Sequence, residues 1–213
     1  MKLYDYYRSS ASYRVRIALN VKNISYETLA VHLINHGGEQ YHPDYLQLNP
    51  QGLVPTLNEN GHIITQSIAI IEYLEEICPT PHLLPQTPLA RAQVRSMALT
   101  IACDVHPLNN LRVLERLRGE FNADEQQILG WYHHWLKLGF DALENRLEAM
   151  PHKNKVCYGN EVSMADVCLI PQVYNAHRFN FSMENYPLIN EIYAYCCSLE
   201  PFKAAAPESN MKD

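Results

Sequence analysis

Two adjacent hydroxyl side chains, Ser9 and Ser10, stand where a short run of strand-forming residues gives way to a helical pattern. Apolar residues recur along one face of this pattern, at Ala11, Val15, Ala18 and Leu19. Arg14 and Arg16 fall outside that face. The two hydroxyls therefore lie at or just before a helix start, where free backbone N–H groups and the positive end of the helix dipole favour an anion. Capping of the helix would explain them as well.

Gln66 and Ser67 open a second helical pattern in the same way. Its apolar face consists of Ile70, Ile71, Leu74 and Ile77. A side-chain amide, a hydroxyl and helix-start N–H groups converge here, which suits a carboxylate. Capping explains Ser67 without a ligand, but it does not explain why two such helix starts occur close together in the chain.

Between these helix starts, Val54 and Pro55 follow a glycine-containing loop, residues 49–52, and lead into a strand. A cis bond at this position would leave the N–H and C=O of Val54 outside the sheet, where they could pair with a peptide-like ligand as an extra strand. An ordinary turn proline with a trans bond is the alternative.

Composition excludes several classes of protein. The formal net charge of −6, without a basic run, argues against a nucleic acid partner. We expect a cytoplasmic protein, because neither a signal peptide nor a stretch of roughly 20 apolar residues is present. The six cysteines form no CxxC pair, so we expect reduced and mostly buried thiols.

No metal site is expected, although the chain has ten histidines. His32 and His36 lie in a glycine-containing loop context, and His133 and His134 are neighbours on a helical pattern. Adjacent helical side chains diverge by roughly 100°, which does not match the ligand spacing of known metal sites.

Residues 1–80 alternate strand and helix signals in the order β-α-β-α-β-β-α, which predicts an α/β domain. Strands are predicted at residues 2–7 and 26–31 and in a hairpin, 54–57 with 62–65, around Asn60-Gly61. Helices are predicted at residues 10–20, 44–48 and 67–77, the last one capped by Ser67.

Residues 81–88 contain three prolines and are predicted to be a linker. The pattern of residues 89–213 is entirely helical, which predicts an all-α second domain. Long helices are expected at residues 89–118, bent at Pro107, and at 124–148. A third helix is expected to begin at Ser163 with a capping box to Asp166, and a last one near Pro187. The tail after residue 206 is expected to be frayed.

Four stretches together resemble the zeta-class glutathione transferases, the family of the maleylacetoacetate isomerases. They are residues 8–19, 48–57, 66–74 and 165–173. The resemblance covers nearly the whole chain. It implies a thioredoxin-like N-terminal domain, a helical-bundle C-terminal domain that binds substrate, a homodimer, and glutathione as cofactor.

The resemblance also implies roles for single residues. The implied cofactor contacts are Ser9, Ser10, Gln40, Val54, Gln66, Ser67, His106 and Asn110. Ser9 matches the serine that hydrogen-bonds the glutathione sulfur. This hydrogen bond lowers the pKa of the glutathione thiol from its ordinary value of about 8.5, so more of the thiol is ionised at neutral pH. A helix kink and its cap are the structural alternatives for His106 and Asn110.

The implied substrate is a dianion, and guanidinium groups bind carboxylates bidentately. Arg178 aligns with the arginine assigned to the substrate carboxylate, Arg8 lies beside Ser9, and Arg112 is a further candidate. The implied catalytic residues are Ser9, Ser10 and Arg178. The glutathione thiolate would add to the cis double bond, the resulting single bond would rotate, and elimination would leave the trans isomer. A surface charge or an ion pair is the alternative for each arginine, above all for Arg112.

Ala11 departs from the family pattern, which usually has cysteine at this position. The nearest alternative is therefore a maleylpyruvate isomerase, a relative that also lacks the cysteine; Ser9-Ser10 and Leu111 favour maleylacetoacetate. A transferase acting on halogenated acids or peroxides is another alternative. A regulatory binding protein with this fold is the alternative outside enzymes, since the fold does not fix the function.

Overall fold

The computed structural model describes residues 1–150 and 155–211, and for His36 only the backbone. The chain divides into two compact units. The first unit comprises Met1–Leu83 together with Ser198–Asp213, and the second comprises Leu84–Cys197. The last segment of the chain is therefore part of the first unit.

The first unit is built on a mixed four-stranded sheet in the order β2-β1-β3-β4. Its strands are β1 (Lys2–Asp5), β2 (Glu27–Ala30), β3 (Thr56–Glu59) and β4 (His62–Thr65). β1 pairs with β2 in parallel and with β3 in antiparallel orientation. The predicted hairpin is confirmed: Asn60 (φ 53°) and Gly61 (φ 93°) both have the positive φ that a tight turn between β3 and β4 requires.

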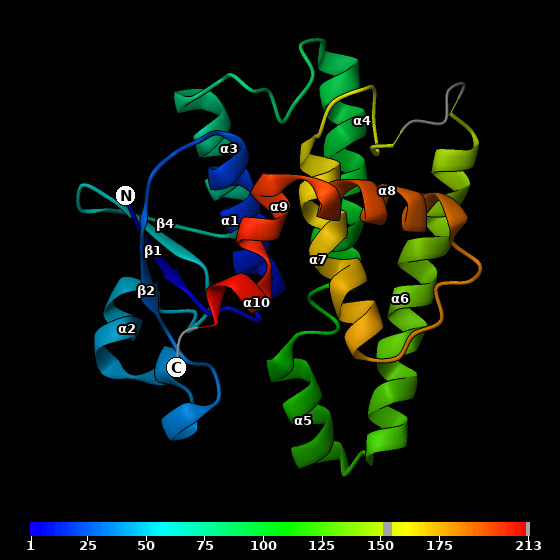
Figure 1. The fold of residues 1–213 in the computed structure, drawn as a ribbon. Coiled ribbons are helices and arrows are strands. Elements are labelled where there is room, and N and C mark those ends of the chain that lie inside the picture. The colour runs from blue at the N-terminus through cyan, green and yellow to red at the C-terminus, as the bar shows by residue number, and fades with distance from the viewer. Residues whose placement is uncertain (151–154, 212–213) are drawn as a thin grey trace. The chain divides into compact units, whose positions relative to one another are not determined.

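Three helices cover this sheet, as predicted: α1 (Ser10–Val21), α2 (Pro43–Leu48) and α3 (Ser67–Ile77). Figure 1 shows α1 beside one face of the sheet and α2 beside the other, and α3 packs against α1. Two short 3₁₀ turns, Asn35–Gly37 and Glu39–Tyr41, precede α2. The core between sheet and helices includes the fully buried Leu3, Val15, Ile17, Leu57, Ile70 and Leu74. The thioredoxin-like order β-α-β-α-β-β-α is confirmed.

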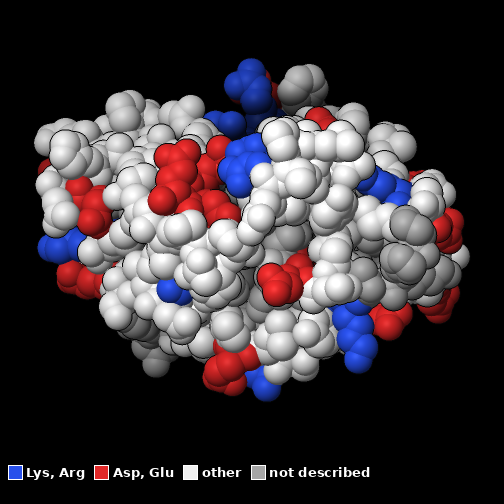
Figure 2. All heavy atoms as spheres, turned by 90° about the horizontal axis from the view of Figure 1, so that it is seen from above, with Lys and Arg blue, Asp and Glu red and all other residues white. Residues whose placement is uncertain are grey.

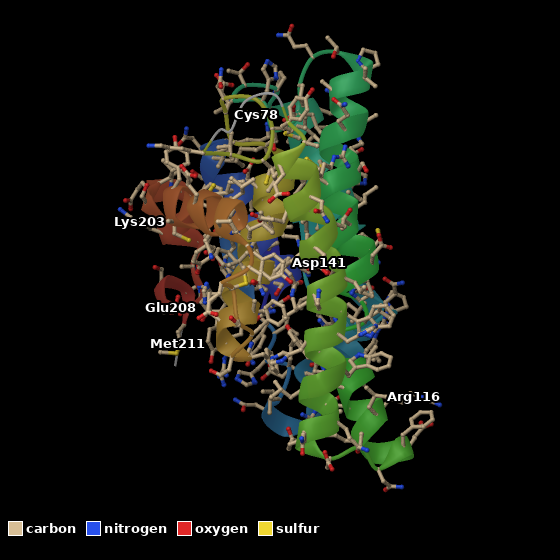
Figure 3. All side chains as sticks on the ribbon, turned by 90° about the vertical axis from the view of Figure 1, so that its right-hand side faces the viewer. Cys78, Arg116, Asp141, Lys203, Glu208 and Met211 are labelled. Carbon is tan, nitrogen blue, oxygen red and sulfur yellow. The ribbon has the colours of Figure 1, made fainter. Side chains whose placement is uncertain are left out.

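The end of the chain differs from the prediction of a frayed tail. It forms α9 (Glu200–Ala205) and α10 (Pro207–Asn210), and α9 packs against α1. Asn210 Nδ2 donates to two backbone carbonyls at 2.8 Å, and Pro207 is buried. Lys203, Glu208 and Met211 are labelled on this segment in Figure 3. Packing on α1, which the local sequence does not reveal, orders these residues.

The second unit is helical, as predicted. Its helices are α4 (Pro88–Leu99), α5 (Leu111–Phe121), α6 (Glu125–Glu148), α7 (Met164–Arg178) and α8 (Pro187–Ser198). The capping box of α7 is confirmed, since the backbone N–H and Oγ of Ser163 donate to Asp166 Oδ2 at 2.8 and 2.7 Å. Burial raises the pKa of this Asp166 carboxyl. Figure 3 shows α5 beside one end of α6, with Arg116 pointing outward.

The prediction of one bent helix over residues 89–118 is wrong. α4 ends at Leu99, a π-helical segment follows over Thr100–Val105, and α5 begins at Leu111. Pro107 lacks the N–H that a continuous helix needs at that position, and Asn110 starts α5 with a side-chain cap to Arg112 N at 3.2 Å. The break leaves residues 106–110 as a separate loop.

Candidate active site

Ser9 is the N-cap of α1. Its backbone N–H donates to Tyr6 O at 2.8 Å, and its Oγ accepts a hydrogen bond from Ser12 N at 3.3 Å. This cap uses a lone pair of Oγ, so the hydroxyl hydrogen can still donate to a ligand. Ser10 is the first residue of the helix and is buried. The predicted helix start at these serines is confirmed.

Arg16 fixes the strand end that precedes Ser9. It is fully buried, and its Nη1 donates to both carboxylate oxygens of Asp5 at 2.7 and 2.9 Å. Its Nη2 donates to Tyr7 O at 2.8 Å and its Nε to Ala205 O at 2.9 Å. A buried guanidinium is tolerated because such bonds satisfy its donors. The sequence pattern placed Arg14 and Arg16 off the apolar face, yet both are buried.

Gln66, not Ser67, is the N-cap position of α3, so the prediction that Ser67 caps this helix is wrong. Ser67 is the first helical residue and is buried, and its backbone N–H is one of those that a helix start leaves without a helical partner. Gln66 has φ 70° and ψ 116°, a conformation that costs a residue other than glycine about 1–3 kcal/mol and recurs at functional sites. Its Nε2 donates to Gln51 Oε1 at 2.9 Å.

Arg14 connects the two helix starts. Its Nη1 donates to Ser67 Oγ at 3.3 Å inside the protein. The contact joins α1 to the first residue of α3, so the two groups of anion-binding candidates belong to one region of the first unit. The sequence analysis did not identify Arg14 as a buried residue. Its neighbours Val15, Ile17 and Ala18 are all buried in a helix that packs on a sheet, and this was the signal that Arg14 could be buried as well.

Val54 lies just outside the sheet, because β3 begins at Thr56. The Val54–Pro55 bond is cis, as is Thr80–Pro81. The loop before Val54 is fixed by Tyr45 Oη and Asn49 Nδ2, which donate to Leu53 O at 2.6 and 2.8 Å. The loop therefore presents the Val54 backbone at a defined position just before the start of β3, an inner strand of the sheet.

Gln40 is buried and reaches the same region. Its Nε2 lies 3.4 Å from Leu33 O, while its Oε1 has no hydrogen-bond partner among the described residues. Leu33 packs against a core cluster that contains Val54 and Tyr6, and the carbonyl of Tyr6 holds Ser9. Gly38 (φ 96°) makes room, because a Cβ there would come within 2.6 Å of Gln40 Nε2.

Ser9, Ser10, Gln40, Val54, Gln66 and Ser67 all lie in the first unit, where Arg14 of α1 contacts Ser67, and Leu33, which contacts Gln40, packs against the core cluster that contains Val54. The group offers a hydroxyl donor, a backbone segment free to pair as a strand, two helix starts and a buried amide oxygen without a partner. These groups fit a small peptide that carries a thiol and carboxylates, because each of its polar parts would find a matching donor or acceptor.

His106 and Asn110 belong to the second unit and lie in the loop between the π-helical segment and α5. His106 N donates to Ile101 O at 2.9 Å, and Asn110 acts as the N-cap of α5. Two contacts from α6 hold this loop: Trp131 Nε1 donates to Leu108 O at 2.8 Å, and Asn109 Nδ2 donates to Tyr132 O at 3.2 Å.

The candidate arginines divide between the units. Arg8, in the first unit, is exposed, and its Nε donates to Tyr7 Oη at 2.7 Å. Arg112 and Arg178, in the second unit, are also exposed. Arg178 ends α7, and its Nη1 donates to Asn175 Oδ1 at 3.3 Å. Each arginine is accessible to a carboxylate ligand.

Within residues 1–150 and 155–211, no group of three or more His, Cys, Asp or Glu side chains could hold a metal ion, and no helix is long and apolar enough to cross a membrane. The six cysteines, all within the described residues, form no disulfide; Cys157, Cys168 and Cys196 are buried, whereas Cys103 is exposed. On the face that Figure 2 displays, Lys and Arg are scattered among Asp and Glu.

The fold of the chain is that of a glutathione transferase. The family model described as "Glutathione S-transferase, N-terminal domain" matches residues 3–82. The probable maleylacetoacetate isomerase of Vibrio cholerae is 47% identical over 207 residues, which are 97% of this chain and 95% of that protein. The maleylpyruvate isomerase of Ralstonia sp is 47% identical over 208 residues, 97% of each protein.

Solved structures of related proteins have the same fold as this chain. A holo maleylpyruvate isomerase of the zeta class superposes with a TM-score of 0.97 at 45% identity and covers 100% of both chains. A glutathione S-transferase from Legionella pneumophila has a TM-score of 0.86 at 57% identity, covering 97% of this chain and 100% of its own. A maleylacetoacetate isomerase from Methylobacterium extorquens, with malonate and GSH bound, has a TM-score of 0.95 at 37% identity, covering 99% and 98%. The chain belongs to the zeta-class glutathione transferases, the family of the maleylacetoacetate and maleylpyruvate isomerases.

Proposed function

We propose that the protein catalyses the glutathione-dependent cis–trans isomerisation of maleylacetoacetate to fumarylacetoacetate, a step in the catabolism of tyrosine and phenylalanine. One observation carries the proposal. Ser9 caps α1 with its Oγ in a chain 47% identical over 97% of its length to a probable maleylacetoacetate isomerase, and Arg14 of the same helix contacts Ser67 at the start of α3.

Ser9 tunes the thiol of bound glutathione in this proposal and is not itself the nucleophile. Its hydroxyl hydrogen donates to the sulfur, and the N-terminus of α1 adds a positive potential. Both interactions favour the thiolate, so they lower the thiol pKa from its ordinary value near about 8.5. Ser10 contributes its backbone N–H at the same helix start.

The remaining residues of the first unit hold the tripeptide. The Val54 backbone pairs with the cysteinyl part as an added strand. Gln66 and Ser67 bind the γ-glutamyl carboxylate at the start of α3, and Gln40 supplies its buried amide. His106 and Asn110 of the second unit are proposed as further contacts. Bound glutathione supplies a thiolate that adds reversibly to the double bond, which permits rotation before elimination.

Arg178, Arg8 and Arg112 are proposed to bind the two substrate carboxylates. A guanidinium stays charged at all working pH values and binds a carboxylate bidentately. The same positive charge offsets the negative charge that develops on the substrate during the reaction. Malonate bound to the M. extorquens relative supports a dicarboxylate site in this family.

Maleylpyruvate is the second candidate substrate. The Ralstonia maleylpyruvate isomerase is 47% identical, and Ala11 stands where maleylacetoacetate isomerases usually have cysteine. The deciding experiment is a spectrophotometric assay of both substrates side by side, with and without glutathione. A higher kcat/KM for maleylacetoacetate supports the proposal, whereas a higher value for maleylpyruvate favours the alternative. Turnover of neither substrate would overturn the isomerase function.

We further propose that the protein is a homodimer in the cytoplasm. The zeta-class relationship supports the dimer. Light scattering coupled to size-exclusion chromatography tests it: a mass of twice 24.5 kDa is expected, and a mass of 24.5 kDa would contradict it.

A further inference from the structure

A pair of stacked rings lies beside Arg178 in the second unit. The Arg178 Cζ atom lies 5.1 Å from the centroid of the Phe179 ring. Phe179 in turn stacks on Tyr132 of α6, with centroids 3.9 Å apart and ring planes inclined by 16°. Because a cation is attracted to the face of an aromatic ring, this stack favours one location of the guanidinium.

The stack is anchored in the core. Tyr132 is only 1% exposed, whereas Arg178 is exposed and accessible to a ligand. His133, the next residue of α6, places its Nε2 2.8 Å from the carbonyl oxygen of Phe179. α6 therefore holds Phe179 both by its ring and by its main chain.

Asn175 holds the guanidinium from a second side. It lies one turn before Arg178 in α7, and its Oδ1 accepts from Arg178 Nη1 at 3.3 Å. The C-terminal end of α7 adds a negative potential that favours a cation in its last turn. Burial raises the pKa of Tyr132 despite the nearby charge of Arg178, so this ring remains a neutral platform.

The same turn of α6 also holds the loop that carries His106 and Asn110. Trp131 Nε1 donates to Leu108 O, and Tyr132 O accepts from Asn109. Residues 131–133 thus contact both the loop that carries His106 and Asn110 and the Phe179 that follows Arg178.

We propose that Phe179 and Tyr132 are positioning residues that orient the Arg178 guanidinium for a carboxylate of the substrate. The inference rests on the proposed function, in which Arg178 binds a carboxylate. A guanidinium already held in its binding orientation loses less conformational freedom when the ligand arrives. Removal of the Phe179 ring should therefore weaken carboxylate binding, although Phe179 itself does not contact the ligand.

The test measures malonate binding by calorimetry in the presence of saturating glutathione. In Phe179→Leu, the dissociation constant for malonate is expected to rise about tenfold. Phe179→Met replaces the ring by an unbranched, adaptable apolar side chain and should show the same loss, which guards against a packing defect specific to the first variant. Phe121→Leu, which removes an exposed ring at the end of α5 in the same unit, should retain wild-type affinity.

A double-mutant cycle separates positioning from general packing. In an Arg178→Ala background, Phe179→Leu should cause no further loss of malonate affinity, because the residue it acts through is gone. Glutathione affinity should remain within about twofold of wild type in every variant. For the isomerase reaction, Phe179→Leu should raise KM more than it lowers kcat.

Three results would overturn the inference. An equal loss in the Arg178→Ala background would show that Phe179 acts independently of Arg178. Unchanged malonate affinity in Phe179→Leu and Phe179→Met, or no malonate binding by the wild-type protein, would also refute it. A wild-type protein that binds malonate through Arg178 but isomerises neither substrate would overturn the proposed function alone.

Discussion

Arg14 donates from its Nη1 to Ser67 Oγ at 3.3 Å, and this bond joins the interior of α1 to the first residue of α3. Both residues are buried. The α1 start, proposed to bind the glutathione thiol, and the α3 start, proposed to bind its γ-glutamyl carboxylate, are thereby linked by a charge-assisted contact. Arg14 itself is not proposed to touch the ligand.

Removal of the Ser67 hydroxyl should weaken glutathione binding. Ser67→Ala deletes both a proposed ligand contact and the acceptor for Arg14, and hydrogen bonds to charged groups contribute about 1.5–3 kcal/mol. We expect the dissociation constant for glutathione, measured by calorimetry, to rise at least about tenfold. Ser96 is a matched control, because its Oγ accepts from Arg146 Nη1 at 2.8 Å in the second unit. Ser96→Ala should leave glutathione affinity unchanged; an equal loss in both variants would refute the assignment.

Ser9→Ala should lower kcat by about 10- to 100-fold, because a hydrogen bond to the thiolate is lost. It should also lower the free energy of unfolding by about 1 kcal/mol through loss of the α1 cap. Thr87 provides the control, since its Oγ1 caps α4 by accepting from Ala90 N at 3.4 Å. Thr87→Ala should lose similar stability in urea unfolding but keep wild-type kcat. Full activity in Ser9→Ala would contradict the role of the hydroxyl.

Ala11→Cys tests the departure from the family pattern. We expect kcat with maleylacetoacetate to stay within about twofold of wild type, because the proposed chemistry uses the thiol of glutathione and none from the protein. Steady-state kinetics with both candidate substrates is the measurement. A large gain in kcat for maleylacetoacetate would show that the missing thiol matters.

Asp141 should make stability depend on pH. Lys137 Nζ donates to its Oδ2 at 2.6 Å and Tyr186 Oη to its Oδ1 at 2.9 Å, and the bond from Lys137 is the main reason why the pKa of Asp141 is lowered. Figure 3 labels this side chain on α6. The pKa of Asp141 is lower in the folded state than in the unfolded state, where it is about 3.9. The ionised carboxylate therefore stabilises the fold at pH values above the unfolded pKa, and this contribution is lost as the pH falls through the folded pKa.

Asp141→Asn should therefore lower the free energy of unfolding by about 0.5 kcal/mol at a pH of about 7. The effect is small because the ion pair of Lys137 and Asp141 is partly exposed. The difference from wild type should shrink as the pH falls below about 4. Urea unfolding at several pH values measures it. A difference that stays constant down to low pH would show that the charge of Asp141 is not its cause.

Local patterns in the sequence predicted most of the fold. The hairpin at Asn60-Gly61, the capping box of Ser163 and Asp166, and the order of strands and helices in the first unit are all confirmed. These features depend on turn geometry and on apolar periodicity, which neighbouring residues specify. The pattern failed at residues 100–110, where the π-helical segment and the loop at Pro107 replace a bend.

The site was predicted less completely, because its supports come from distant parts of the chain. The apolar periodicity of a helix predicts that an arginine lies on the surface. Arg16 is nevertheless buried, because Asp5 and the carbonyl of Ala205, 189 residues away, accept its hydrogen bonds. Arg14 is likewise held by Ser67, and the positive φ of Gln66 has no signal in local composition. Partners separated by such distances cannot be derived from spacing along one helix.

The central claim is that glutathione acts as a catalyst and is not consumed. The most direct measurement incubates the wild-type protein with excess maleylacetoacetate and substoichiometric glutathione, and then quantifies both fumarylacetoacetate and free thiol. We predict many product molecules per glutathione and full recovery of the free thiol, with no turnover when glutathione is omitted. Consumption of one glutathione per product, or isomerisation without glutathione, would contradict the account.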